Sequence, residues 1–458
     1  MSIARRAVFD RRRTGLLLHP TSLPGAHGAL GSAARQFVDW LADAGFSVWQ
    51  LLPLGPVGAD GSPYWSRGDG AISAALIDTA EADAHAQDSQ SFTSFCHGQA
   101  DWLEDYALFE AIAAAHGGVP WWQWPAPLRD REPRALDGMR NAQAPTLHAI
   151  RVQQWHAASQ WRRLRDHAHA RDVRLFGDVP IYVAPDSSTV WAERNQFQLR
   201  PDGQPDLVAG VPPDYFAEDG QRWGNPLYDW GQAQRDGFAF WRRRMRRAFA
   251  QFDLVRIDHF RGLCAYWAVA AEAPSARTGH WQPAPGAELL GALAGEFPDL
   301  PLVAEDLGVI TPDVDQLRQT WKLPGMRVMQ FGFDGSGRNP HLPHNYGFDT
   351  VAYSGTHDND TTVGWYRGLD VATRAHVDSY LGSRPRTMPT TLVRALLNSI
   401  APLAVVPLQD VLARGSRARF NTPGTVTGNW SWRYESGDLT AALAAKWRTL
   451  SRQSGRCD

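Results

Sequence analysis

The sequence predicts a (β/α)8 barrel of the TIM type, an α/β fold, with helical insertion subdomains between barrel strands. Eight short apolar runs end in a polar or charged residue. Helix-like patterns lie between most of these runs, and strands that alternate with helices favour a parallel sheet. The chain has 458 residues, which suits one large barrel domain, since such barrels often exceed about 200 residues.

The eight predicted strands span almost the whole chain. They are Leu16–His19, Val48–Pro53, Val173–Asp178, Asp253–Asp258, Leu302–Asp306, Met326–Asp334, Val351–Asp358 and Leu403–Asp410. In this fold, polar residues at the carboxyl ends of the strands face the active site. We therefore expect one cluster of strand-end residues: His19, Asp178, Asp258, Glu305, Asp334, His357, Asp358 and Asp410.

Three segments between the strands carry helix signals. Ala33–Gly45 has amphipathic spacing, with Gly45 as a stop, and Phe238–Gln251 is a predicted helix with a basic outer face. Thr311 is a predicted N-cap, and Pro312 occupies the first helical position. These segments supply helices that the barrel requires.

Two long spacings interrupt the strand and helix pattern of this single catalytic domain (residues 1–458). Residues from about 80 to 170 contain helical patterns and are predicted to form an insertion subdomain. Residues from about 180 to 235 are rich in Pro, Gly and Asp, with several aromatics in their second half. Because long loops inside a compact domain are usually functional or disordered, we predict a structured, substrate-covering segment there.

Composition excludes several classes of partner and compartment. The net charge is −2 and the pI is near 6.7, so no basic field attracts nucleic acid or a membrane surface. Three scattered cysteines point to a reducing compartment. We find neither a secretory signal nor an apolar run of the roughly 18 residues that span a membrane. The expectation is a soluble cytoplasmic protein, and its 20 Trp residues offer flat faces that suit sugar rings.

Three carboxylates that end predicted strands suggest chemistry on acetals. A retaining glycosidase uses one ionised carboxylate as nucleophile and a protonated one as acid, about 5–5.5 Å apart. Arg256 precedes Asp258 by two residues, so both side chains lie on the same side of the strand. A nearby cation keeps a carboxylate ionised, as a nucleophile requires. A purely structural Asp–Arg pair is the alternative for this strand end.

The other two carboxylates fit the remaining roles. Glu305 follows an apolar run and has no cation within three residues, which favours a raised pKa and an acid role. Asp306 remains an alternative for that role. Asp358 could hold ring hydroxyls and help distort the sugar, or be an ordinary turn residue. His259 and His357 could bind substrate hydroxyls.

Several sequence blocks resemble a known family. RIDHFRG, AEDLG and GTHDNDT, in this order, are similar to the signature blocks of the amylomaltases, the 4-α-glucanotransferases or disproportionating enzymes of the α-amylase superfamily. GLLLHPTSLPG, GVPPDYFAEDGQRWGNPLYDW, PGMRVMQFGFDG and QDVLARGSRARFNTPGTVTGNWSWR agree. The resemblance extends from about Gly15 to about Arg433.

The resemblance implies a role for each matching residue. Asp258 would be the nucleophile, Glu305 the acid/base and Asp358 the transition-state stabiliser. Ten further residues would bind substrate: Arg256, His259 and His357 at the donor subsite, Asp334 at a hydroxyl, Tyr64 by stacking with Ser62 beside it, Asp214, Gln221 and Trp223 on the acceptor side, and Asn421 from the last strand's loop.

The implied reaction is glucan transfer by retaining double displacement. An α-1,4-glucan forms a covalent glucosyl-enzyme intermediate and passes to the 4-hydroxyl of glucose or a maltooligosaccharide, with no cofactor or metal. The block WSRGDGAISAALID departs from the family pattern, because Arg67 and Asp69 add charges. If this departure has an effect, we expect the effect to be on acceptor preference.

Three alternatives remain at the level of sequence. A hydrolase of the same superfamily would use the same carboxylates with water as acceptor, but an aromatic-rich covering segment favours transfer. A metal-dependent barrel hydrolase would favour an H-x-H pair on the first strand, which has only His19. A non-catalytic carbohydrate-binding protein would not need the three strand-end carboxylates together with Arg256.

Overall fold

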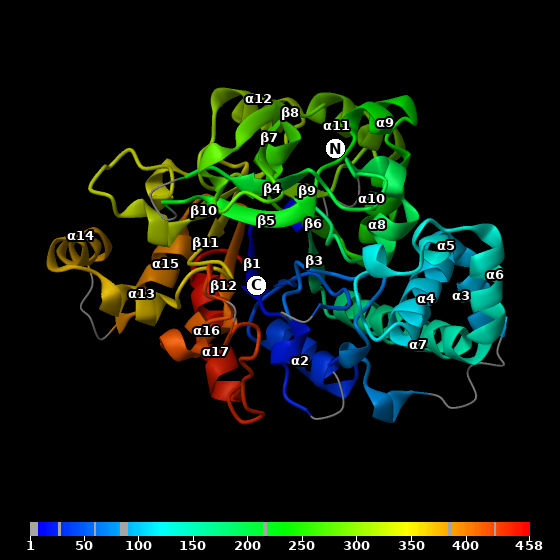
Figure 1. Cartoon of the computed structure of the whole chain (residues 1–458). Helices are drawn as coiled ribbons and strands as arrows, with labels where there is room; N and C mark the ends of the chain where they lie inside the picture. Colours follow the sequence, from blue (N-terminus) through cyan, green and yellow to red (C-terminus); the bar gives the residue numbers. More distant parts are fainter. Residues whose placement is uncertain are drawn as a thin grey trace.

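The computed structural model describes residues 8–25, 29–58, 61–82, 90–213, 218–382, 387–425 and 427–458. Eight parallel strands close into a barrel in the order β1–β12–β11–β10–β9–β6–β3–β2 (Figure 1). They are β1 (Arg13–Leu17), β2 (Val48–Gln50), β3 (Arg174–Val179), β6 (Leu254–Ile257), β9 (Leu302–Ala304), β10 (Gly325–Val328), β11 (Thr350–Tyr353) and β12 (Leu403–Pro407). Each overlaps one predicted run, so the barrel prediction is confirmed.

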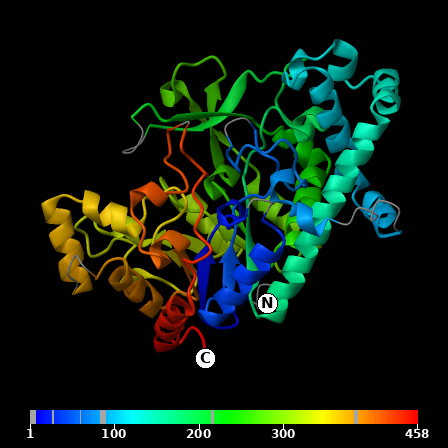
Figure 2. The same ribbon diagram turned by 90° about the horizontal axis from the view of Figure 1, so that it is seen from below.

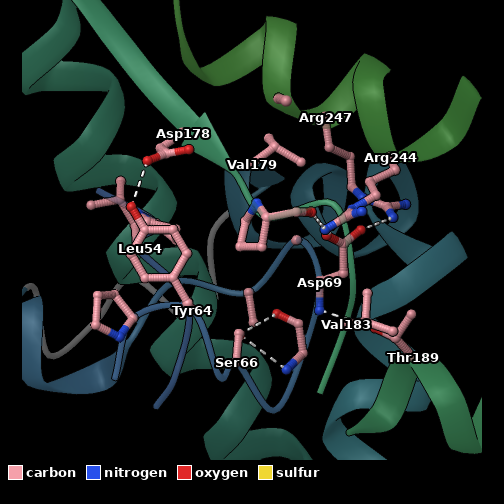
Figure 3. A pocket seen from close by; sticks show the side chains of 18 of the residues that line it. Leu54, Tyr64, Ser66, Asp69, Asp178, Val179, Val183, Thr189, Arg244 and Arg247 are labelled. Carbon is pink, nitrogen blue, oxygen red and sulfur yellow. Dashed lines mark hydrogen bonds and ion pairs between the residues drawn. The ribbon is translucent and has the colours of Figure 1, made fainter. Parts of the chain in front are cut away.

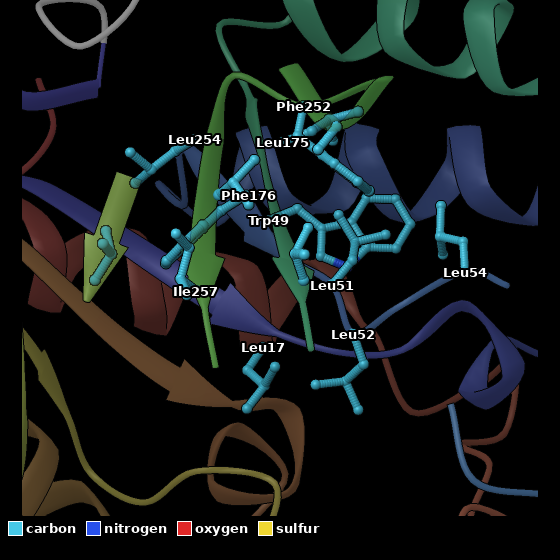
Figure 4. Packing of buried hydrophobic residues seen from close by; sticks show 14 of the residues in the cluster. Leu17, Trp49, Leu51, Leu52, Leu54, Leu175, Phe176, Phe252, Leu254 and Ile257 are labelled. Carbon is cyan, nitrogen blue, oxygen red and sulfur yellow. The ribbon is translucent and has the colours of Figure 1, made fainter. Parts of the chain in front are cut away.

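The barrel strands are apolar because both of their faces are buried. Side chains from β1, β2, β3 and β6 pack together inside the wall, among them Leu17, Trp49, Leu175, Phe176, Leu254 and Ile257 (Figure 4). Phe252 lies directly against Gly177 of β3, where a Cβ atom would come within 2.3 Å of its ring. Only glycine therefore fits at this strand position.

The barrel closes by pairing its first strand with its last, β1 with β12. The C-terminus secures this closure through Arg456, whose side chain is fully buried. Its guanidinium donates to four backbone carbonyls, those of Arg13 (2.9 Å), Leu397 (2.7 Å), Ser399 (3.1 Å) and Ala401 (2.9 Å). Burial lowers the pKa of Arg456 to about 9, so it stays cationic at neutral pH and the carbonyl dipoles balance its charge.

Helices surround the barrel as the sequence pattern requires. They include α2 (Ser32–Asp43), α10 (Ala239–Gln251), α11 (Gly286–Glu296), α12 (Pro312–Thr320), α13 (Thr362–Gly368), α14 (Val371–Leu381), α15 (Thr390–Asn398), α16 (Leu408–Val411) and α17 (Ala441–Gln453). Thr311 is the N-cap of α12, and Gly45 with φ of 78° follows the end of α2, as predicted. The expected basic outer face of α10 is wrong in part, because Arg244 is buried and binds Asp69.

The chain between β2 and β3 forms helices α3 (Gln90–Gly98), α4 (Ala100–Ala115), α5 (Ala126–Arg129), α6 (Pro133–Ala142) and α7 (Ala144–Ala170). In both views they lie on one side of the barrel, with α13, α14 and α15 on the other (Figures 1 and 2). The 27-residue α7 contacts α2 and β3. The insertion is therefore packed against the barrel wall.

The chain between β3 and β6 contributes α8 (Ser188–Ala192), β4 (Leu207–Val211), β5 (Gln221–Pro226) and α9 (Trp230–Arg235). Strands β4 and β5 join β7 (Ala265–Ala270) and β8 (His280–Pro283) in an antiparallel sheet of order β5–β4–β7–β8. This sheet lies on the opposite side of the barrel from α17 (Figures 1 and 2). Within the described ranges, no helix is both long and apolar enough to cross a membrane.

Candidate active site

Arg256 on β6 is the centre of a buried ionic network. Its Nη2 donates to Asp258 Oδ1 (2.7 Å), and its Nη1 donates to both oxygens of Asp178 (2.8 and 2.7 Å). Asp178 and Arg256 are register partners on neighbouring strands β3 and β6. Burial opposes the charge of Arg256, but the two carboxylates outweigh it and raise the pKa of Arg256 well above its ordinary value. The expected Arg256–Asp258 pairing on one side of the strand is thus present.

Asp178 is the residue of this network for which no chemical role was predicted. Its carboxylate is completely buried and also accepts the hydroxyl of Tyr64 (2.7 Å). Burial raises the pKa of Asp178, while the charge of Arg256 opposes that rise. The sequence signal for this pairing was the position of Asp178 at the end of a predicted strand. Asp178 and Arg256 lie at the same level near the ends of two adjacent strands.

Glu305 follows β9 and lies in an environment unlike that of Asp258. Its two oxygens accept the backbone N–H groups of His259 (2.7 Å) and Leu307 (3.0 Å). Burial raises the pKa of Glu305 to about 7, although the positive charge of Arg256 opposes the shift. The carboxyl group therefore exchanges its proton near neutral pH, as a group that alternates between acid and base requires.

The neighbouring Asp306 is held in other contacts. Its carboxylate accepts the Met326 N–H (2.6 Å) and forms ion pairs with Arg327 (3.0 Å) and Arg318 (3.4 Å). These contacts tie β9 to β10 and α12. Asp306 is therefore a structural anchor, and Glu305 is left as the candidate acid.

Asp358 combines an ionised state with an open face. Its side chain is 47% exposed, yet it contacts His357 Nε2 (3.1 Å) and accepts the amide of Asn421 (2.7 Å). Burial opposes ionisation, but these two partners lower the pKa of Asp358 well below its usual range. In return, Asp358 raises the pKa of His357 against the effect of burial. The loops after β11 and β12 meet at this carboxylate, where Arg419 also donates to the Asp358 carbonyl (2.9 Å).

Aromatic rings form a wall beside these carboxylates. The Tyr64 ring stacks on His357 with centroids 5.2 Å apart and an interplanar angle of 19°. Trp430 lies 6.1 Å from Tyr64 and 5.9 Å from His357. Ser62 accepts the Tyr64 N–H (3.3 Å) and so shapes the turn that presents the ring. The place of Trp430 in this wall was not predicted from the sequence.

A second aromatic contact joins the four-stranded sheet to the barrel. Trp223 of β5 meets the His259 ring edge-on at 4.9 Å and donates its indole N–H to Gln221 (3.1 Å). Burial lowers the pKa of His259 to about 4, so this imidazole is neutral at pH 7. Its Nε2 has no hydrogen-bond partner within the described part of the chain, which leaves that nitrogen available to a hydroxyl group.

Asp410 is held apart from this cluster, Asp334 is exposed in the loop after β10, and Asp214 falls outside the described residues. Asp410 is buried and accepts hydrogen bonds from Ser354 (2.7 Å) and Thr362 (2.7 and 2.6 Å), so the expectation that it faces the site is wrong. Asp334 is exposed and accepts the Ser336 N–H (2.8 Å). Asp214 lies outside the residues that the structure describes.

The two charges of the unusual WSRGDG block face protein groups. Arg67 pairs with Glu110 (3.0 Å) and Asp186 (2.8 Å). Asp69 pairs with Arg244 (3.0 Å) and Arg247 (2.8 Å). Both charges are thus balanced inside the protein, which removes the reason to expect that they contact an acceptor directly.

The parallel barrel brings Asp258, Glu305 and Asp358 close to the buried Arg256, an arrangement suited to acid–base and nucleophilic chemistry on sugars. A family profile described as 4-alpha-glucanotransferase (glycoside hydrolase family 77) matches residues 18–85 and 70–440. The 4-alpha-glucanotransferase of Thermus thermophilus is 44% identical, over 97% of this chain and 99% of that protein. The 4-alpha-glucanotransferase of Synechocystis is 42% identical, over 98% and 99% respectively.

A solved structure agrees with these sequence relatives. The amylomaltase from Streptococcus agalactiae in complex with acarbose superposes with a TM-score of 0.94 and 32% identity, covering 98% of this chain and 100% of that one. The chain belongs to the 4-alpha-glucanotransferase family. It is therefore an enzyme of the glucan-transferring class.

Proposed function

We propose that Asp258 and Glu305 carry out the transfer of an α-1,4-glucan segment to the 4-hydroxyl of glucose or a maltooligosaccharide. The contrast between their two environments carries this assignment. Asp258 is ion-paired with Arg256 at 2.7 Å, whereas burial raises the pKa of Glu305 to about 7. One carboxylate paired with a cation and one carboxyl group with a raised pKa are what a retaining double displacement requires.

In the first step, an oxygen of Asp258 attacks the anomeric carbon of the donor glucan. The glycosidic C–O bond breaks, and Glu305 gives its proton to the departing oxygen, so the shortened glucan leaves as a neutral alcohol. In the second step, the ionised Glu305 takes the proton of the acceptor's 4-hydroxyl. The resulting oxygen displaces Asp258 from the same carbon and regenerates both carboxyl groups with net retention.

The remaining contacts support the oxocarbenium-like transition state. Asp358 is ionised and half exposed, and we assign it to hydroxyls of the distorted donor ring. His357 and Asn421 hold that carboxylate from two different loops. Arg256 keeps Asp258 oriented, and the neutral His259 offers a sugar hydroxyl its Nε2, which has no partner among the described residues.

The aromatic groups give the substrate its remaining surfaces. We assign Tyr64, with Ser62 beside it, to stacking against the donor sugar. Trp223 and Gln221 are assigned to the acceptor side, together with Asp214. Asp334 is assigned to a substrate hydroxyl at the outer edge of the site.

The segment of about residues 180–235 is proposed to cover the bound glucan. Its strands β4 and β5 form part of the four-stranded sheet, and Trp223 of β5 contacts His259 next to Asp258. Covering the intermediate keeps water away from the anomeric carbon and leaves the sugar hydroxyl as the preferred acceptor. The helices at about residues 80–170 are proposed to be a side subdomain of the single catalytic domain. We also propose a cytoplasmic location, in keeping with the free Cys96, Cys264 and Cys457.

Incubation with maltotriose, without added metal, tests the proposed reaction. Free glucose and the chain-length ladder are followed over time, with Asp258→Asn as the matched control. Glucose together with a ladder of longer maltodextrins is the expected result. Glucose and maltose alone would identify a hydrolase, and absence of reaction on any α-glucan would refute the assignment.

A further inference from the structure

An ion-pair cluster of Asp69, Arg244 and Arg247 lies close to Tyr64 and Asp178. Asp69 accepts Arg244 Nε (3.0 Å) on one oxygen and Arg247 Nη2 (2.8 Å) on the other. The three side chains line a cavity of about 90 Å³ whose wall also includes Tyr64 and Asp178 (Figure 3). This cluster therefore borders two residues of the candidate active site, Tyr64 and Asp178.

Arg244 binds two separate segments of the chain at once. Through Nε it holds Asp69, five residues after Tyr64. Through Nη2 and Nη1 it donates to the carbonyls of Pro180 (2.6 Å) and Ile181 (3.1 Å), which follow Asp178. Only 3% of the Arg244 side chain is exposed. One rigid guanidinium thus spans the two segments whose side chains meet in the hydrogen bond from Tyr64 to Asp178.

The loop that carries Asp69 is also seated on the neighbouring helices. The Asp69 N–H donates to Thr189 Oγ1 (3.1 Å), and the Arg67 carbonyl accepts the Ser188 N–H (2.8 Å), both from α8. Between them, a Cβ atom on Gly68 would lie 2.6 Å from the ring of Tyr106 on α4. The loop is therefore closely packed against α8 and α4, and Asp69 joins it to α10 by ion pairs.

We propose that Arg244 is a positioning residue for the transfer reaction, acting with Asp69 to set the contact between Tyr64 and Asp178. The Tyr64 hydroxyl lies 2.7 Å from Asp178, which in turn holds Arg256. Arg244 and Asp69 together form a clamp. This clamp fixes both the aromatic face offered to the donor sugar and the ionic network next to Asp258. Buried, hydrogen-bonded guanidinium–carboxylate pairs are suited to such a role because their geometry is directional.

This inference rests on the proposed function, since it takes Tyr64 as part of the donor subsite. Small displacements of positioning groups can cost up to about 100-fold in rate. Replacing Asp69 by asparagine removes the charge that both arginines share and weakens the clamp while keeping the side-chain size. We expect kcat/KM for maltotriose transfer to fall about tenfold, roughly 1.4 kcal/mol in transition-state stabilisation, with kcat and KM both changed.

The matched control is Asp101→Asn. Asp101 binds the same Arg247 (3.0 Å), but from a more exposed position outside the cavity. The control is expected to keep kcat/KM within about twofold of the original enzyme. Thr189→Ala, which removes only the hydroxyl that accepts the Asp69 N–H, is a milder variant in case Asp69→Asn does not fold. It is expected to lower kcat/KM in the same direction by about threefold.

A double-mutant cycle with Tyr64→Phe separates positioning from general structural support. Tyr64→Phe removes the hydroxyl through which the clamp acts. In that background we expect Asp69→Asn to lower kcat/KM by no more than about twofold, because contacting residues couple non-additively. The same tenfold loss in both backgrounds would overturn the proposal, as would unchanged kinetics in Asp69→Asn or a loss equal to it in Asp101→Asn. If the original enzyme formed no maltodextrin ladder, the proposed function itself would fail, which is a distinguishable result.

Discussion

Replacing Glu305 by glutamine tests whether the buried carboxyl group of Glu305 destabilises the folded protein when it is ionised. Burial raises the pKa of Glu305 from 4.5 to about 7. The folded state therefore binds this proton more tightly than the unfolded state, and stability falls as pH rises from 4.5 to about 7. Since one pKa unit corresponds to about 1.4 kcal/mol, ionised Glu305 costs the fold about 3 kcal/mol above neutral pH.

Glutamine avoids this cost but loses one acceptor. Glu305 accepts N–H groups from His259 and Leu307 through separate oxygens, and glutamine has only one such oxygen. Losing one hydrogen bond costs about 1 kcal/mol. We therefore expect Glu305→Gln to be about 2 kcal/mol more stable than the original enzyme at pH 8, and about 1 kcal/mol less stable at pH 4.5.

Thermal unfolding of both proteins at a series of pH values from 4.5 to 8, at one scan rate and ionic strength, measures this crossover. Glu288→Gln on the exposed face of α11 is the matched control and should show no crossover. A stability difference that does not change with pH, or a Glu305→Gln variant less stable at pH 8, would refute the reasoning.

In activity assays the rate of glucan transfer by the Glu305→Gln variant should fall at least about 100-fold. The original enzyme's kcat/KM should fall above pH 7 as Glu305 loses its proton.

Three further substitutions test other parts of the site. Asp258→Asn should abolish maltotriose transfer with an unchanged near-UV circular dichroism spectrum; substantial residual activity would move the nucleophile elsewhere. Asp178→Asn removes the more buried of the two carboxylate partners of Arg256, so it should cost about 3 kcal/mol of stability together with most activity, measured by thermal unfolding and kcat. Asn421→Ala removes one support of Asp358 and should lower kcat about tenfold; an unaffected kcat would show that His357 alone orients this carboxylate.

The barrel strands and the carboxylates that follow them were predictable because both produce local sequence patterns. Parallel strands buried on both faces are apolar runs, and Asp258 and Glu305 directly follow such runs. The prediction failed where the chain turned at once after a strand. Strand β10 ends at Val328 and is followed by a 3-10 helix at Met329–Gly332, so the predicted strand extends too far and Asp334 lies in the exposed loop beyond it. Helix α16 begins directly after β12 and places Asp410 in the interior.

Ion pairs between residues far apart in the chain could not be predicted from the sequence. Asp178 and Arg256 are 78 residues apart, and Asp69 and Arg244 are 175 residues apart. No local pattern indicates that a particular arginine of a basic helix turns inward to meet a distant aspartate. The basic face of α10 was for this reason assigned to solvent, although Arg244 is one of the most buried charges in the described structure.

Closing the barrel between its first and last strands has a consequence for how the chain is made. Strand β1 ends at Leu17, and its partner β12 begins at Leu403. At synthesis rates of about 5–20 residues per second, β1 emerges roughly 20–80 seconds before the strand that completes its hydrogen bonding. During that interval the growing chain has an open sheet edge, a known template for misassembly. Because Arg456 must then reach the carbonyl of Arg13, the barrel gains this last support only after the segment that follows α17 has also been made.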